Sequence, residues 1–303
     1  MTTETGPKAG PNGWLILDKP LGLSSAQGVA ATKRILRGIG IRPDRIGHGG
    51  TLDPLATGVL PIAIGEATKL AGRMLDATKA YDFTVKWGEA TATEDAEGDV
   101  IATSDVRPDA AAIAAVLPRF TGPIDQVPPA YSALKVDGQR AYTLARAGES
   151  FELAVRHVTI HSLVLVESTH DSATFSASVS KGTYIRSLAR DIALALGTVG
   201  HVTMLRRTKA GPFSLDQAIS LDKFESLVQE RALEQALLPL MAGLDDIPAL
   251  AIDPEQAAAL RQGRRLFGHP ATPGTYLACL GSVPVALVEI DQEAVRVVRG
   301  FNL

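Results

Sequence analysis

The sequence has little of what marks several protein classes. It has one cysteine, Cys279, among 303 residues. It therefore cannot form an internal disulfide or a cysteine-based zinc site, and a reducing, cytoplasmic setting is expected. No apolar run reaches the ~18 residues that a membrane-spanning helix needs. Residues 1–11 are rich in Gly, Pro and Thr and lack the apolar stretch of a signal peptide, which predicts a flexible tail.

Charge is nearly balanced over the whole chain but unevenly distributed. The formal net charge is −3. Residues 216–255 carry nine acidic and two basic side chains, whereas residues 31–50 carry five basic and one acidic. Such asymmetry is compatible with a polyanion bound to one face, and equally with an ordinary solvated surface. Hydrophobic residues make up 46% and charged residues 21%, which is typical of a packed globular protein and excludes disorder.

Apolar periodicity predicts an α+β protein. Strands are predicted at 14–17, 59–64, 81–87, 100–102, 157–166 and 174–180, and helices at 26–37, 66–75, 110–117 and 185–196. Ser24 and Ser25 are the candidate N-caps of the first helix. Because strands and helices do not alternate in a strict βαβ rhythm, a mainly antiparallel sheet is favoured over a doubly wound parallel one.

Two later stretches differ in texture from the rest. Residues 121–150 are punctuated by glycine and proline and mix tyrosine with basic residues, which indicates a long irregular insertion, either functional or disordered. After the acidic segment, a short helix at 254–264 and closely spaced strands at 276–280, 283–288 and 295–298 follow, with Gly281 at a turn. They predict a separate small β domain, near the lower size limit for independent folding.

A glycine-dense loop at 47–54 carries the residues best suited to chemistry. Asp53 stands before a proline, which alone indicates a helix cap, and His48 between glycines can be a turn residue. Glycines also let a backbone approach a ligand closely, and a carboxylate there can act as a nucleophile. Tyr81 shares a strand face with core residues, and Arg186 can simply cap a helix. Taken singly, these positions leave the alternatives open.

Taken together, six motifs resemble one family. They lie in order at 17–20 (LDKP), 47–60 (GHGGTLDPLATGVL), 65–69 (GEATK), 79–81 (KAY), 131–135 (YSALK) and 180–186 (SKGTYIR). The chain closely resembles the TruB family, the bacterial tRNA pseudouridine-55 synthases, over about residues 12–245 and more faintly beyond. It departs from the family at Gly49-Gly50, where a His-Thr-Gly order is commoner, but it keeps small residues there.

The resemblance implies a fold and a domain organisation. The expected fold is the pseudouridine synthase fold, with a central mixed, mainly antiparallel sheet flanked by helices. The catalytic domain would span 12–245, with an RNA-gripping insertion at about 121–152. Residues 246–303 would form a small β-rich, PUA-like RNA-binding domain.

The resemblance also implies an activity and roles for particular residues. The enzyme would flip out the uridine at position 55 of the tRNA T loop, detach uracil from C1′ and reattach it through C5. Asp53 would be the nucleophile, acting at C6 or at C1′, and Arg186 would keep it ionised. Tyr81 would stack on the base and assist the closing proton transfer. The other expected substrate contacts are Tyr184 walling the pocket, His48 filling the place of the flipped base or contacting flanking RNA, and Leu205 and Lys19.

The expected RNA contacts are basic residues. They are Lys33, Arg34, Arg37, Lys135, Arg140, Arg146, Lys181, Arg206 and Arg207. The partner would be the T arm of tRNA, bound by a cytoplasmic monomer with no obligate protein partner. No metal cluster or nucleotide-binding glycine motif stands out, and the isomerisation changes no redox state, so no cofactor and no metal are expected. Two other hypotheses are an RNA-folding protein without catalysis and a nucleoside hydrolase.

Overall fold

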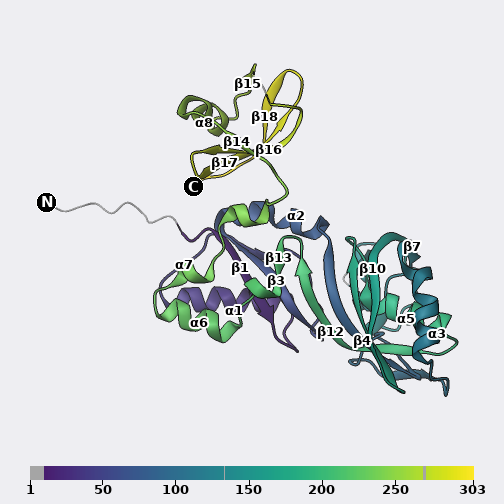
Figure 1. The fold of residues 1–303 in the computed structure, drawn as a ribbon. Helices are drawn as coiled ribbons and strands as arrows, with labels where there is room; N and C mark the ends of the chain where they lie inside the picture. Colours follow the sequence, from purple (N-terminus) through teal and green to yellow (C-terminus); the bar gives the residue numbers. More distant parts are fainter. Residues whose placement is uncertain (1–9, 133, 269–270) are drawn as a thin grey trace.

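The computed structural model describes residues 10–132, 134–268 and 271–303 (Figure 1). Most of the tail expected at 1–11, and Ala133 of the 131–135 motif, lie outside the described residues. Two sheets dominate the described chain, a large one from the first two thirds and a smaller one near the C-terminus. Figure 1 shows the smaller sheet set on one side of the larger body.

The large sheet has nine strands within the described residues. Their order is β1 (Gly13–Lys19), β3 (Ala56–Ile64), β12 (Gly200–Ala210), β4 (Lys79–Trp87), β11 (Ser172–Val179), β10 (Arg156–Ser168) and β7 (Gly122–Gln126), with β2 (Ile46–His48) paired to β3 and β13 (Phe213–Ser214) paired to β12. Of the pairs among these nine described strands, only β3–β12 is parallel. The predicted α+β class with a mixed, mainly antiparallel sheet is confirmed.

Alternation along the strands decides which face of the sheet is covered. In β4, Phe83, Val85 and Trp87 are fully buried, as their period-two spacing predicts. Phe83 stacks on Phe175 of β11 with ring centroids 5.2 Å apart. These residues share one core cluster with the helices, which therefore lie on this face of the sheet.

The helices form two groups at opposite ends of that face (Figure 1). One group is α1 (Ser25–Gly38), α6 (Leu221–Gln229) and α7 (Leu233–Ala236), and the other is α3 (Ala110–Val116) and α5 (Ile185–Ala195). The predicted cap of α1 is confirmed, because Ser24 accepts a hydrogen bond from the Gln27 backbone and Gln27 caps it in return.

The remaining elements are short. They are η1 (Gly65–Leu70), α2 (Ala71–Asp76), β5 (Glu89–Thr91), β6 (Val100–Thr103), η2 (Leu117–Phe120), β8 (Lys135–Val136), β9 (Gln139–Arg140), α4 (Ala141–Arg146), η3 (Leu215–Gln217) and η4 (Leu240–Gly243). The helix predicted at 66–75 is thus a 3-10 turn followed by an α-helical turn.

One sequence-based expectation is wrong, and one strand was missed. Residues 122–126 are not irregular but form β7, the edge strand that pairs with β10. A proline is tolerated there because an edge strand need not donate on both sides. The central strand β12 was not predicted at all, since Arg206, Arg207 and Lys209 hide its apolar alternation.

The C-terminal sheet has its own core and also packs against the larger body. Its order is β14 (Ala249–Ala251), β16 (Gly274–Leu280), β17 (Val283–Ile290), β18 (Ala294–Gly300) and β15 (Leu266–Phe267), and α8 (Pro254–Arg261) packs on it. Gly281 has φ of +61°, as the predicted turn requires. Leu277 and Phe301 join a second cluster with Trp14 of β1, so the two sheets share buried apolar surface.

Candidate active site

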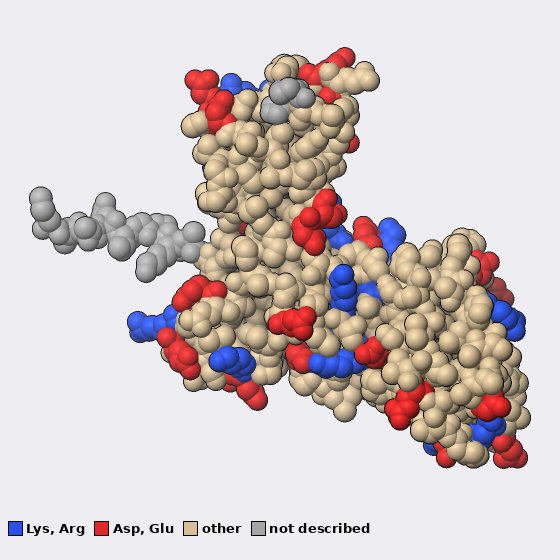
Figure 2. All heavy atoms as spheres, in the orientation of Figure 1, with Lys and Arg blue, Asp and Glu red and all other residues tan. Residues whose placement is uncertain are grey.

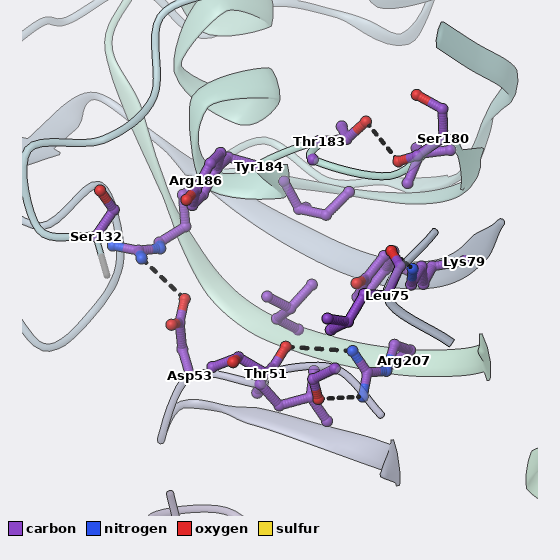
Figure 3. A pocket seen from close by; sticks show the side chains of 18 residues that line it. Thr51, Asp53, Leu75, Lys79, Ser132, Ser180, Thr183, Tyr184, Arg186 and Arg207 are labelled. Carbon is purple, nitrogen blue, oxygen red and sulfur yellow. Dashed lines mark hydrogen bonds and ion pairs between the residues drawn. The ribbon is translucent and has the colours of Figure 1, made fainter. Parts of the chain in front are cut away.

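A hollow of about 250 Å³ opens over the central strands (Figure 3). Its lining comes from the glycine-dense loop, from α2, from β4 and β12, and from the segment that leads into α5. Asp53 and Arg186 face each other at one end of this hollow, and Arg207 lies beside Thr51 of the loop (Figure 3). Residues distant in sequence therefore meet at one place.

Arg186 holds the Asp53 carboxylate by one of its two terminal nitrogens. Its Nη2 lies 2.9 Å from Oδ2 of Asp53, and its Nη1 lies 3.5 Å from Oδ2 of Asp95. The Arg186 side chain is 5% exposed, whereas that of Asp53 is 39% exposed. The pair is thus anchored on the protein side and open on the hollow side, so the carboxylate is available to a ligand.

The backbone around Arg186 fixes the direction of its guanidinium. Nη1 donates to the Thr93 carbonyl at 2.8 Å, and Nη2 donates to the Tyr131 carbonyl at 3.1 Å. The Gln126 side chain of β7 accepts from the Tyr184 N–H at 2.8 Å and donates to the Tyr184 carbonyl at 3.1 Å. Strand β7, which the sequence pattern assigns to an irregular insertion, therefore positions the start of α5.

Arg207 holds the Asp53 loop from behind. Its Nε donates to the Val59 carbonyl at 2.8 Å, while its terminal nitrogens donate to the Thr51 and Gly50 carbonyls, each at 3.2 Å. Arg207 is 1% exposed. The expectation that Arg207 belongs to an exposed RNA-binding surface is therefore wrong, because its guanidinium is buried and donates to backbone carbonyls of the loop and of β3.

Lys19 supports the same loop from β1. It is fully buried, and its Nζ donates to the carbonyls of Leu23 at 2.5 Å, Pro20 at 3.1 Å and Pro54 at 3.3 Å. Burial lowers the pKa of Lys19 to about 8, although Asp53 acts in the opposite direction. The expectation that Lys19 contacts the substrate is wrong in this structure, since its ammonium group is enclosed by backbone carbonyls.

Small residues in the loop allow close packing. A Cβ added at Gly49 would lie 2.6 Å from the Cβ of Met74 in α2, so the glycine lets α2 approach the loop. Ser25 accepts from the Leu52 N–H at 2.7 Å and donates to the Leu52 carbonyl at 3.0 Å. The first turn of α1 thus ties down the residue before Asp53.

Aromatic and aliphatic side chains form the walls of the hollow. Tyr81 of β4, Tyr184 before α5 and Leu205 of β12 all line it. Burial raises the pKa of the Tyr184 hydroxyl, which keeps that group neutral. A hollow lined by two aromatic rings and an aliphatic side chain suits a planar base, because bases stack on aromatic side chains.

His48 ends β2 and does not line this hollow. Its Nδ1 is buried and has no hydrogen-bond partner within the described residues. Burial, and to a smaller extent Arg207, lowers the pKa of His48, so the imidazole is neutral at physiological pH.

The expected RNA contacts are scattered over the surface. Arg34 and Arg37 are exposed on α1, and Lys33 is half-buried there. Arg206 pairs with both carboxylate oxygens of Asp18, at 3.0 and 2.9 Å. Lys181 pairs with Asp76 of α2 at 3.0 Å.

The last three expected contacts lie in the segment after β7. Lys135 of β8 and Arg140 of β9 are exposed. The Arg146 guanidinium of α4 lies 5.7 Å from the centre of the Tyr142 ring. Arg146 and Tyr142 both line another hollow, which lies on the other side of Asp53.

Sequence reasoning missed two polar residues of the site. Asp95, 2% exposed, completes the Arg186 network, but its sequence signal was only that of a turn. Lys79 opens β4 and lines the hollow, and burial lowers its pKa to about 8. Within the ranges that the structure describes, no group of three or more His, Cys, Asp or Glu side chains could hold a metal ion.

Comparisons with known proteins agree on one family. The model of the TruB family pseudouridylate synthase N-terminal domain matches residues 33–185, and that of the tRNA pseudouridylate synthase B C-terminal domain matches residues 186–245. A tRNA pseudouridine synthase B of Novosphingobium aromaticivorans is 64% identical over 297 residues, with 96% of this chain and 98% of the relative covered. One of Zymomonas mobilis is 53% identical over 302 residues, with 100% of both covered.

Solved structures share the fold. An H/ACA RNP bound to a substrate RNA containing 2′-deoxyuridine matches with a TM-score of 0.73 and 25% identity, covering 99% of this chain and 92% of the other. A Cbf5-Nop10-Gar1 complex matches with a TM-score of 0.73 and 26% identity, covering 99% and 91%. The predicted pseudouridine synthase fold is therefore confirmed.

Proposed function

Since the chain belongs to the TruB family and is a tRNA pseudouridine synthase, an isomerase that converts uridine in tRNA to pseudouridine, we propose that its target is uridine 55 of the T loop and that Asp53 is its nucleophile. The observation that carries the proposal is the Asp53–Arg186 pair, buried on its arginine side and open toward a base-sized hollow. Arg186 holds the carboxylate in place through a charge-assisted hydrogen bond.

The chemistry requires one bond to break and another to form. The C1′–N1 bond breaks, uracil turns, a C1′–C5 bond forms, and the proton on C5 leaves while N1 gains one. A fixed carboxylate supports this by adding to C6 of uracil or by capturing C1′ as the first bond breaks. Either route uses the exposed face of Asp53, and no redox partner is needed.

The size of the hollow implies base flipping. A volume of about 250 Å³ admits a base but not a folded RNA loop, so the uridine must leave its stack, at a cost of a few kcal/mol. Tyr81, Tyr184 and Leu205 would then hold the ring. Arg207 and Lys19 act indirectly, by holding the loop that carries Asp53.

A T-arm RNA carrying tritium at C5 of uridine 55 tests the proposal. Release of tritium from an unbroken RNA indicates isomerisation at that site. Free uracil would indicate hydrolysis, and binding without tritium release would indicate an RNA-folding role. The matched control carries the label at another T-arm uridine and should release none. Release from that control instead would move the target away from position 55.

The C-terminal unit, 246–303, is proposed to bind RNA outside the T arm. Because Leu277 and Phe301 pack against the larger body, removing residues 246–303 would expose part of the core of that body. Point changes are cleaner: replacing the exposed Arg264 and Arg265 with glutamate should raise KM for whole tRNA. A T-arm hairpin should be used equally well by both enzymes. Loss on both substrates would contradict the proposal.

The remaining proposals concern setting and partners. In the described part of the chain, no helix has the length and apolarity to cross a membrane. We place the enzyme in the cytoplasm with its tRNA substrate, as a monomer that needs no cofactor and no obligate protein partner. Light scattering checks that the enzyme is a monomer. Activity of the purified chain after EDTA treatment checks that it needs neither a metal cofactor nor a protein partner.

A further inference from the structure

A second hollow, of about 510 Å³, lies beside the uridine pocket. It is enclosed by α2, by the turn from β12 to β13, and by residues 243–246 that lead to the C-terminal sheet. Figure 2 shows basic and acidic side chains gathered on this face where the smaller lobe meets the larger body. Its size is within the range of small-ligand sites.

The two hollows share one wall. Leu75 and Lys79 line the uridine pocket, while Asp76, Ala77 and Thr78, which lie between them in sequence, line the second hollow. A nucleotide strand whose base enters the first hollow needs only to cross this wall to reach the second. Continuity with the uridine pocket argues for the same RNA as the occupant.

The lining of the second hollow suits a nucleotide. Met74, Ala77 and Pro212 offer apolar surface, and Arg73, Lys209, Asp245 and Asp246 offer donors and acceptors. Arg73 is paired with Asp246 at 2.9 Å, while Lys209 is exposed and forms no ion pair with any residue that the structure describes. A base presents a flat apolar ring with a polar edge, and its phosphate needs a free cation.

We propose that this hollow binds the nucleotide adjacent to the target uridine, with its base against the apolar floor and its phosphate on Lys209. The inference rests on the proposed function, because it takes the T arm as the ligand. The Asp76–Lys181 ion pair stands beside the shared wall, with side chains 69% and 65% exposed. Exposed pairs are weak, so an incoming phosphate can replace Asp76 at Lys181 at little cost.

The test couples one side chain to one phosphate. Lys209→Met should raise the Kd for the T arm about fivefold and reduce the salt slope by about one, as loss of one phosphate contact does. A neutral methylphosphonate at one of the two linkages flanking the uridine should weaken binding similarly. Both changes together should cost no more than either alone, because they remove the same contact.

Controls separate this inference from the proposed function. Lys223→Met makes the same change at an exposed lysine of α6 and should bind RNA like the wild type. Saturating RNA should restore full tritium release to Lys209→Met, and Lys209→Gln should repeat its effects should the methionine variant fold poorly. Unchanged affinity, or effects additive with both methylphosphonates, would overturn the second site. A wild type that releases no tritium would instead overturn the proposed function.

Discussion

The hollows on the two sides of Asp53 differ in charge. On the uridine side, Lys79 and Arg207 line a hollow of about 250 Å³. On the other side, three carboxylates, those of Asp95, Glu97 and Asp99, line one of about 630 Å³ together with Arg146. Both hollows also share Asp53, Ser132 and Arg186, so Arg186 stands on the boundary between a basic and an acidic region.

This difference indicates where the RNA backbone runs. Phosphates are attracted to cations and repelled by carboxylates, so the strand should approach from the uridine side. On the acidic side, burial raises the pKa of Glu97, and Asp95 and Asp53 add to the rise. The carboxylates on that side are therefore suited to holding Arg186 in place, whereas Arg146 is the residue there that stays an expected RNA contact.

The largest expected effect belongs to the carboxylate shared by both sides. Asp53→Asn keeps the size of the side chain and removes its charge, so tritium release should fall by about 10³-fold or more. The Kd for the T arm should change less than threefold or so, because the group acts on the reaction. Appreciable turnover by this variant would remove Asp53 from the nucleophile role.

The boundary arginine should come next. Arg186 binds two carboxylates and two carbonyls at once, a geometry that lysine cannot reproduce. Arg186→Lys should lower kcat by about 10²-fold with little change in KM. In an Asp53→Ala background, the same change should cost almost nothing further. A near-normal kcat would contradict the role of the ion pair.

Arg207 should affect stability more than chemistry. Arg207→Met removes the guanidinium donors from three carbonyls, two of them buried, at a cost of about 3 kcal/mol in the free energy of unfolding. Activity should fall as well, because the Asp53 loop loosens. Urea denaturation measures the first effect, and Arg206→Met on the same strand is the control, with at most about 1 kcal/mol lost. Equal losses would remove the special role of Arg207.

Lys79 on the basic side should make stability depend on pH. Its pKa is about 8 in the folded protein against 10.5 unperturbed, chiefly because of burial. Between these values the unfolded state binds more protons, so the free energy of unfolding should rise with pH. Relative to Lys79→Met, the wild type should gain roughly 1–3 kcal/mol from pH 8 to 10.5. A flat difference in urea unfolding would contradict the low pKa.

The smallest effects should separate the two sides by salt dependence. Lys181→Met on the uridine side should lower the slope of log Kd against log salt by about one. Glu97→Gln on the acidic side should leave that slope unchanged, since a carboxylate makes no phosphate contact. A steeper slope in the Glu97 variant would place RNA on both sides of Asp53.

The order of the six motifs was enough to predict the family. Apolar periodicity was enough to predict β4 and the buried faces of the helices. Asp53 and Arg186 were chosen from sequence, and the structure brings them to 2.9 Å. Their catalytic roles, like the boundary at 245, stay predictions. Strand β7 was missed because turn-forming residues occur in it, and β12 because basic residues interrupt its apolar pattern.

The sequence by itself determined most of the helices and strands and the motif that carries the carboxylate, because periodicity and turn chemistry are local. Only the tertiary structure decided what each charge does. Arg206 and Arg207 are neighbours on one strand, yet successive side chains point to opposite faces. One therefore meets Asp18 near the surface, while the other is buried against the carbonyls of the Asp53 loop. Burial and partners arise from residues far away in the chain, which no local pattern records.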